Sequence, residues 1–308
     1  MDSRLTRIHR LLEDPYTKLN CLFLQAAIPV FDTVNTVLQS DKPCIHILHS
    51  VLLDLLQSVL VRFIKPASIT SAATLTAVQF KDKEHQKSDD DITVGSAAKE
   101  FILKNSVAMA SRLPQFYASV RQYYVNACTY MISKFPFHDP VLLNAEVANI
   151  GTRDQQSVKK LMFFVERYSC LLPPSATIDS LEEQFNNYQI ASLPEAVKNA
   201  ERIDEAWHEI GHIPDVATGL PKFGLLSSAV KGILVIFHSN ADCERIFSVV
   251  NKNKTEFCAN ISTNTLGSLL TRKTTMSAQH FHKHTWESAD QEDYDVCPTF
   301  PQTHLGVC

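Results

Sequence analysis

Residues 239–257 read SNADCERIFSVVNKNKTEF, and this stretch decides the fold prediction more than any other part of the chain. Ser239 or Asn240 can cap a helix over residues 241–256, because a short side-chain oxygen accepts from the free amides of a first helical turn. Acidic residues follow at once, where the helix dipole favours negative charge. The apolar residues recur at helical spacing, so an amphipathic helix is predicted whose stripe is Cys243, Ile246, Phe247 and Val250.

A second helix is expected shortly after the first. Ser262 or Thr263 can serve as its cap, and the leucines that follow fall on one face, namely Leu266, Leu269 and Leu270. The two predicted helices form a helix–turn–helix pair with an apolar seam.

The rest of the chain also favours helices. Hydrophobic residues make up 45% of the 308 residues, which is enough to bury a sizeable core, and only eight residues are glycine. All-β folds need many tight turns with positive φ, so scarce glycine argues for a mainly α fold. The run ILVIF at 233–237 is the one candidate strand, and it fits a buried helix equally well.

Apolar periodicity and proline positions divide the chain into helices. Pro29 should kink or split a helix over 16–39, Pro66 should end a helix over 43–64, and Pro114 should break a long helical pattern over 96–134. Residues 81–91, KDKEHQKSDDD, are expected to form a solvated loop. The remaining helices are expected at 4–13, 139–149, 155–170, 178–190 and 199–210.

Charge and cysteine usage limit the classes of function. The formal net charge is −4, which gives no general attraction to nucleic acid, although residues 222–283 carry a local excess of basic side chains. The eight cysteines include no CxxC pair, which is typical of reduced thiols in the cytosol or nucleus. The N-terminus lacks the features of a secretory signal, and no membrane-spanning segment is expected.

Several histidines form patterns that can bind metal. His208-Glu209-Ile210-Gly211-His212 matches HExxH, in which two histidines one helical turn apart hold zinc and the glutamate activates water. The alternative is a pair of surface histidines beside a buried Trp207. His280, His282 and His284 alternate in a polar tail, and His46 and His49 lie in an apolar helix where core histidines with hydrogen-bond partners are expected.

Three stretches together resemble the C-terminal block of hAT-family transposases. They are RIDEAWHEIG, GLPKFGLLSSAVKGILVIFHSNADCERIFSVVNKNKTEF and ISTNTLGSLLTRKTTM, and the likeness is strongest over residues 202–276. It implies the helical insertion domain of a hAT transposase, followed by the last helices of a truncated ribonuclease-H-like core. Residues 1–221 would be the insertion-like region, 222–285 the core helix and dimerisation segment, and 286–308 an acidic tail that is expected to be disordered.

The same resemblance places Glu244 at the last carboxylate of the family's metal-binding triad. The two aspartates of that triad would precede Met1, so Glu244 is expected to be a relict and the chain is expected not to be an enzyme, with no metal or cofactor. Two-metal phosphoryl transfer needs carboxylates from separate elements, and a single glutamate cannot hold two ions. Cys258 also departs from the family, which usually has an arginine at that position.

We therefore expect a catalytically inactive, truncated or domesticated transposon-derived protein that acts through dimerisation. The expected dimerisation residues are Ile246, Phe247, Val250, Leu266, Leu269 and Leu270. The partner would be a second copy or a hAT-derived protein, in the nucleus by resemblance or otherwise in the cytoplasm. Weak DNA binding is the most that is expected of this chain, with no membrane and no small-molecule substrate. The alternatives are a partial gene model of an active transposase, a nucleic-acid-binding module and a zinc peptidase.

Overall fold

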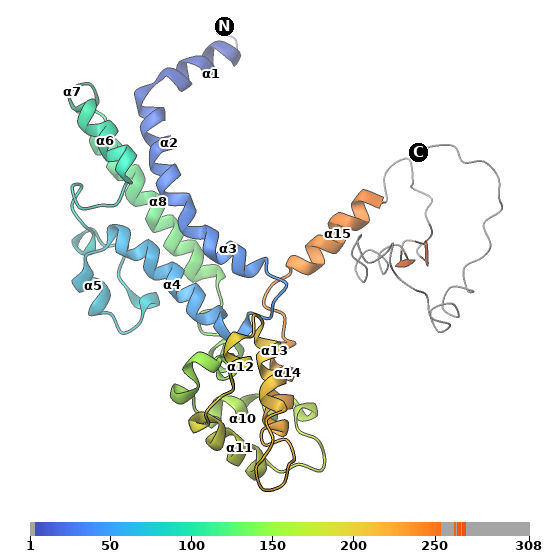
Figure 1. Ribbon diagram of the computed structural model, residues 1–308. Helices are drawn as coiled ribbons and strands as arrows, with labels where there is room; N and C mark the ends of the chain where they lie inside the picture. Colours follow the sequence, from blue (N-terminus) through green and yellow to red (C-terminus); the bar gives the residue numbers. More distant parts are fainter. Residues whose placement is uncertain (1–3, 254–261, 263, 266, 269–308) are drawn as a thin grey trace, which may run out of the picture. The chain divides into compact units, whose positions relative to one another are not determined.

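The computed structural model describes residues 4–253, 262, 264, 265, 267 and 268 (Figure 1). The chain divides into two compact units, residues 1–241 and residues 242–308. Over the described residues every regular element is a helix, and the only β-type pairing is two isolated bridges, Ile64 with Gln86 and Pro214 with Pro221. The prediction of a mainly α fold is therefore confirmed.

The first half of the larger unit contains long and short helices together with three short 3-10 turns. In chain order they are α1 (Arg4–Glu13), α2 (Pro15–Ala27), η1 (Ile28–Phe31), α3 (Asp32–Leu38), α4 (Ile45–Phe63), α5 (Pro66–Thr70), η2 (Leu75–Ala77), η3 (Lys83–His85), α6 (Ser96–Lys104), α7 (Ser106–Met109) and α8 (Leu113–Lys134).

The second half contains shorter helices. They are α9 (Pro140–Ala145), η4 (Glu146–Ala148), η5 (Ile150–Gln155), α10 (Val158–Arg167), η6 (Ser169–Leu171), α11 (Ile178–Ile190), α12 (Glu195–Asn199), α13 (Ile203–Gly211) and α14 (Gly224–Leu234). The smaller unit contributes α15 (Ala241–Asn253).

Proline and aspartate start several of these helices. Asp14 accepts from the Tyr16 amide at 3.0 Å just before α2, and α2 begins with a proline, whose missing amide costs nothing in a first turn. Pro29 divides the predicted 16–39 helix into α2, η1 and α3, as expected. The prediction for Pro114 was wrong in position, because the breaks lie at Asn105 and at 110–112 and Pro114 stands in the first turn of α8.

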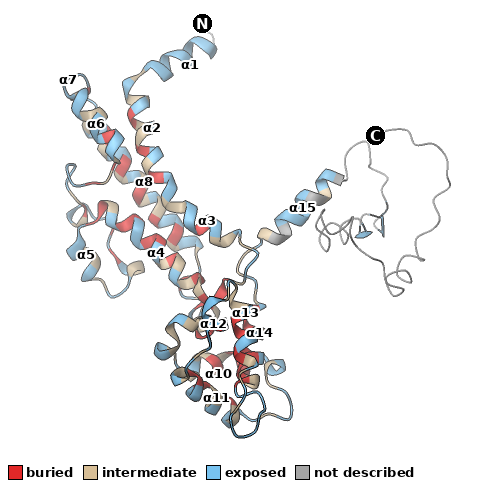
Figure 2. Cartoon of the chain, viewed as in Figure 1, coloured by how far each residue is buried: buried red, intermediate tan, exposed pale blue. Residues whose placement is uncertain are grey.

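Helix α4 forms the centre of the first half. It contributes nine buried residues (Figure 2) and lies beside α8 (Figure 1), and it also packs against α9. Phe63 stacks on Tyr124 of α8, with ring centroids 5.4 Å apart and an angle of 16° between the planes. The Tyr124 hydroxyl donates to the Thr93 carbonyl at 2.7 Å, so its one polar group is satisfied inside the core. Cys128, one turn further along α8, is fully buried, and burial raises the pKa of its thiol to about 12.

Trp207 organises the second half. It is fully buried, its indole nitrogen donates to the Ala148 carbonyl at 2.8 Å, and its ring lies 5.0 Å from that of Tyr188. Helices α13 and α14 approach closely at Gly211, where an added Cβ would lie only 2.6 Å from the Ser227 hydroxyl oxygen. The glycine therefore allows the two helices to pack directly against each other.

A partly buried ionic cluster joins the two halves. His49 of α4 lies 3.0 Å from one carboxylate oxygen of Glu146, and the Lys160 ammonium lies 2.8 Å from the other. Burial alone would raise the pKa of the Glu146 carboxyl, but hydrogen bonds from Lys160 and His49 lower it overall. The cluster satisfies a carboxylate that would otherwise be costly at this depth.

The polar loop over 81–91 is more ordered than its composition predicts. It contains η3, and the buried Gln86 donates from its side chain to the Phe80 carbonyl at 2.9 Å. Gln86 also pairs with Ile64 in an isolated antiparallel bridge. The expectation of a wholly solvated loop was therefore wrong at Gln86, because a satisfied amide can be buried at little cost.

Helix α14 belongs to the same compact unit as the helices before it. The larger compact unit extends to Ala241, and within it α14 packs on α13 and α11. The division after residue 221 that the resemblance implies stays a prediction. Two helical stretches, Pro15–Leu38 and Ile45–Phe63, are long and apolar enough to cross a membrane by length and composition alone. A core helix passes the same test, and α4 is one, as its nine buried residues show.

Candidate functional site

Helix α15 carries most of the site residues that the sequence predicts. The Ser239 hydroxyl accepts from the Ala241 amide at 3.3 Å and donates to the Leu38 carbonyl, so Ser239 acts at the start of α15 as expected. The helix is described as far as Asn253, and the end of the predicted span, 254–256, lies outside the described residues.

Two residues of the predicted apolar stripe of α15 are open to solvent. The side chains of Ile246 and Phe247 are 42% and 66% exposed, and Val250 is half-buried. At 100° per residue the three positions lie within an arc of about 100° on the helix surface. A solvent-exposed phenylalanine beside an isoleucine on one helix face is the arrangement that a partner surface can cover.

Glu244 lies on the same helix and is exposed. Within the described part of the chain, no three His, Cys, Asp or Glu side chains come together in a geometry that could hold a metal ion. Glu244 is therefore not part of a metal-binding cluster among the described residues.

The second predicted helix is described only in part. Asn264, Thr265, Gly267 and Ser268 are helical, and the Ser262 hydroxyl oxygen accepts from the Thr265 amide at 3.1 Å, as a helix cap does. The predicted dimerisation residues Leu266, Leu269 and Leu270 lie outside the described residues, as do His280, His282 and His284.

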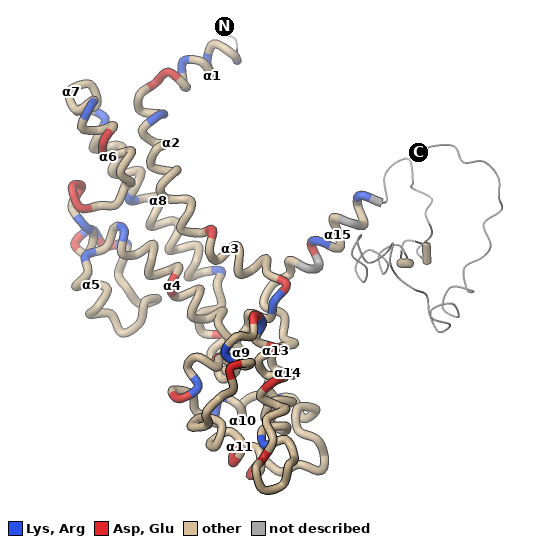
Figure 3. The backbone as a smooth tube through the Cα atoms, viewed as in Figure 1, with Lys and Arg blue, Asp and Glu red and all other residues tan. Residues whose placement is uncertain are grey.

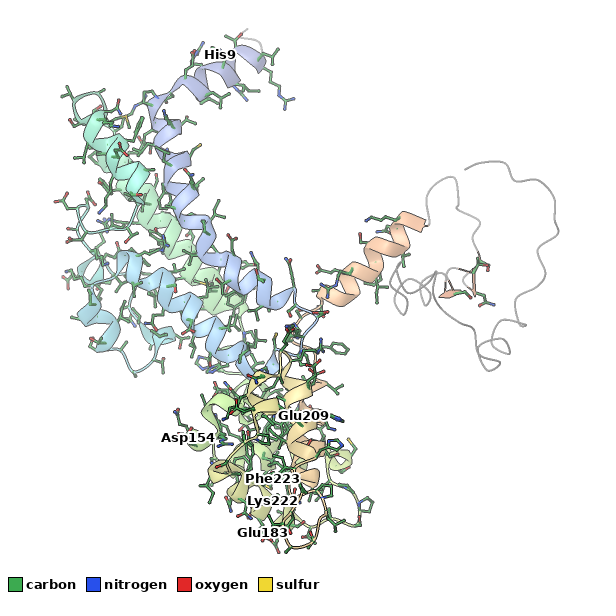
Figure 4. The ribbon with its side chains drawn as sticks, viewed as in Figure 1. His9, Asp154, Glu183, Glu209, Lys222 and Phe223 are labelled. Atoms are coloured by element: carbon green, nitrogen blue, oxygen red, sulfur yellow. The ribbon has the colours of Figure 1, made fainter. Side chains whose placement is uncertain are left out.

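The HExxH residues lie at the end of α13. Trp207 is buried, whereas His208, Glu209 and His212 are exposed, and Glu209 can be located on α13 in Figure 4. His212 is the C-cap residue, and its Nδ1 lies 2.7 Å from the His208 carbonyl oxygen. That ring nitrogen is therefore paired with a backbone carbonyl. In this structure His208 and His212 are surface histidines beside a buried Trp207, which is the alternative that the sequence offered to a zinc site.

The two core histidines differ from each other. His49 pairs with Glu146, as expected for a histidine at the edge of the core. His46 is buried, but its Nδ1 has no hydrogen-bond partner among the described residues, so the expectation of a satisfied histidine was wrong there. Burial lowers the pKa of His46 to about 4, which keeps the ring neutral at physiological pH.

One hollow was not singled out by the sequence reasoning. It has a volume of about 570 Å³ and is lined by one face of α8 and by lysines of the 81–91 loop. In the sequence these lysines stand beside aspartates and a glutamate, and Figure 3 shows the two charge types mixed between α5 and α6. The sequence alone does not show which of these side chains line the hollow. In the fold Lys81, Lys83 and Lys87 line it, whereas Asp82 and Glu84, which stand between them in the sequence, do not.

Comparison with known proteins gave no match: no family model, no curated protein and no solved structure is significantly similar to this chain.

Proposed function

We propose that this protein is a hAT-transposase-related, transposon-derived chain that is catalytically inactive and acts by associating with another protein through α15. The preferred partner is a second copy or a hAT-derived relative. The likeness of residues 202–276 to the hAT C-terminal block supports the family assignment. The mainly α fold is compatible with the helical insertion region that this resemblance implies.

The exposure of Ile246 and Phe247 is the observation that carries the proposal. Full burial of one such side chain against a partner stabilises a complex by roughly 1.5–3 kcal/mol before the entropic cost of association. Aromatic side chains at the centre of an apolar patch dominate many interfaces. Phe247 lies at one edge of the arc that it shares with Val250 and Ile246, and its side chain is more exposed than that of Ile246.

Glu244 supports the inactive assignment. It is exposed on α15, and a two-metal centre needs carboxylates converging from several elements. We infer that the negative charge of Glu244 interacts favourably with the helix dipole near the start of α15.

The test is the mass of the purified chain as a function of concentration, measured by light scattering from about 1 to 100 μM, where complexes of ordinary affinity form. The unmodified chain should be a dimer at the upper end, and Phe247→Ser should weaken the dimer by at least about tenfold. Tyr130→Ser is the matched control, because Tyr130 is an exposed aromatic on α8, outside the proposed surface. Association through α15 is contradicted if the unmodified chain is a strict monomer. It is also contradicted if Phe247→Ser and Tyr130→Ser weaken the dimer equally.

The other functions are distinguished by separate measurements. Magnesium-dependent nicking of DNA that Glu244→Ala abolishes would establish an active transposase subunit instead. Stoichiometric zinc that is lost in His208→Ala would establish a zinc site. The local basic excess gives less support to a nucleic-acid module, because Lys231 lines a hollow together with Asp204, Glu205 and Glu209.

A further inference from the structure

The hollow between α8 and the 81–91 loop has the composition of an anion site. Four cationic side chains, Lys81, Lys83, Lys87 and Arg121, line it, against one carboxylate, Asp89. Asp89 is already engaged, because the Arg121 guanidinium lies 2.5 Å from its oxygen. Among the described residues no carboxylate forms an ion pair with any of the three lysines. The Lys87 ammonium donates to the Val61 carbonyl at 2.6 Å, and the Lys81 ammonium lies 5.9 Å from the centroid of the Phe80 ring.

The fold holds this charge in place. Arg121 also donates to the Lys87 carbonyl at 2.7 Å, which fastens the lysine-bearing loop to α8. The buried Gln86, which also lines the hollow, donates to the Phe80 carbonyl. Asp82 is turned to the backbone, where it accepts from the Glu84 amide at 2.9 Å. The lysines are thus presented from an anchored loop, which lowers the entropic cost of binding a ligand.

The side of the hollow that α8 forms is less polar than the side that the 81–91 loop forms. Pro114, Tyr117 and Val125 line it at intervals of three and four residues, so they share one face of α8 with Arg121. Burial, together with the charges of Asp89 and Asp90, raises the pKa of Tyr117, so its phenol stays protonated and can donate a hydrogen bond. A ligand that fits must combine a concentrated negative charge with a flat or apolar part.

We propose that this hollow binds a nucleotide, with its phosphate among Lys81, Lys83 and Lys87 and its base over Tyr117 and Val125. The volume of about 570 Å³ lies in the range of small-ligand sites. Lysine is an established phosphate-binding side chain, and bases pack on aromatic and apolar surfaces. The nucleotide can be free or one residue of a single strand, since both present the same phosphate and base. The inference is independent of association through α15.

The test is calorimetric titration of the full chain with AMP, adenosine and a ten-nucleotide oligo(dT). AMP or the oligonucleotide should bind, and adenosine should bind at least about tenfold more weakly than AMP, because it lacks the phosphate. Preference for AMP identifies a free nucleotide. Preference for oligo(dT), with affinity that falls steeply as salt rises, identifies a single strand.

The decisive variant is K81Q/K83Q/K87Q, which should weaken the preferred ligand by at least about tenfold. The matched control is K99Q/K134Q/K159Q, which removes the same charge from exposed lysines outside the hollow. If the first variant does not keep the helical circular dichroism of the unmodified chain, the single variant K83Q replaces it, with K99Q as its control.

Three results would overturn the proposal. The first is no binding of either phosphate-bearing ligand at about 1 mM. The second is measurable binding of AMP that adenosine equals. The third is an equal loss of ligand affinity in K81Q/K83Q/K87Q and in its matched control. That result would show that overall charge, and not this site, attracts the ligand.

Discussion

Trp207 fills the space between α11, α13 and η4 and satisfies a buried carbonyl. Trp207→Phe keeps an aromatic ring but removes the indole donor, so the Ala148 carbonyl loses its partner. We expect a loss of about 1–3 kcal/mol in the free energy of unfolding, measured by urea titration with circular dichroism. Trp207→Ala should cost about 3–5 kcal/mol, because it also leaves a cavity.

Tyr130→Phe provides the comparison for Trp207→Phe. Tyr130 is 62% exposed on α8, so removal of its hydroxyl should change stability by less than about 0.5 kcal/mol. A Trp207→Phe effect as small as this would show that the Ala148 bond contributes little.

His46 should make the fold sensitive to mild acid. Its pKa in the folded chain is about 4, below the ordinary value of about 6.5, so the unfolded chain takes up a proton first as pH falls. The stability that the neutral ring provides is therefore complete above about pH 6.5 and is lost progressively down to about pH 4. The loss attributable to His46 between pH 7 and pH 5 should be about 2 kcal/mol.

The measurement is the free energy of unfolding at both pH values for the unmodified chain and for His46→Leu. The variant cannot titrate at this position, so its pH dependence should be smaller by that amount. Glu146 and other carboxylates contribute equally to both proteins. Parallel pH dependence in the two chains would show that His46 titrates normally.

At the scale of helices, the contact between α13 and α14 should tolerate no side chain at Gly211. Alanine has the higher helix propensity by about 1 kcal/mol, which alone would stabilise α13. Its Cβ, however, would lie 2.6 Å from the Ser227 oxygen and 2.9 Å from the Ser227 Cβ. The cost of overpacking should exceed the gain in helix propensity. Gly211→Ala should therefore lower the free energy of unfolding by about 1–3 kcal/mol, measured by urea titration.

Two comparisons show whether overpacking is the cause. Gly232→Ala on α14 also meets a neighbour, but that neighbour is the flexible end of Leu171, so its cost should be smaller. Adding Ser227→Gly to Gly211→Ala removes the obstructing side chain and should recover part of the loss. If Gly211→Ala is neutral or stabilising, the helices can separate freely at this point.

Helix positions were largely predictable from the sequence, and the deviations have physical causes. Pro29 separated helices as expected because it follows a completed turn, whereas Pro114 lies inside a first turn that has no need of its amide. The expected 199–210 helix begins only at Ile203, as α13, because Ala200 and Arg202 have extended backbone, and α12 precedes it as a separate short helix. Such short breaks depend on tertiary packing, which periodicity cannot show.

At the scale of the whole molecule, the larger unit should fold without the smaller one. A chain that ends at Ala241 keeps all the buried residues of the core described above. We expect it to retain the helical circular dichroism of the core and its free energy of unfolding within about 0.5 kcal/mol, while it loses self-association. Collapse of the helical signal would show that the core depends on residues 242–308.

The two proposed sites were not equally visible in the sequence. The apolar stripe of α15 follows from local spacing, so Ile246, Phe247 and Val250 could be predicted before their exposure was known. The lysine-lined hollow required the fold, because Arg121 and Tyr117 lie about thirty residues beyond the lysine loop. In a sequence, a run of mixed charge resembles any solvated loop.

Cys128 gives the protein a built-in reporter of opening. Its thiol is fully buried, and a pKa of about 12 leaves almost no reactive thiolate near neutrality, whereas Cys21 and Cys170 are exposed. An alkylating reagent should therefore modify those two at once and reach Cys128 only in molecules whose α4–α8 contact has parted. The rate of that slow modification, followed by mass spectrometry, measures how often the interior becomes accessible under native conditions.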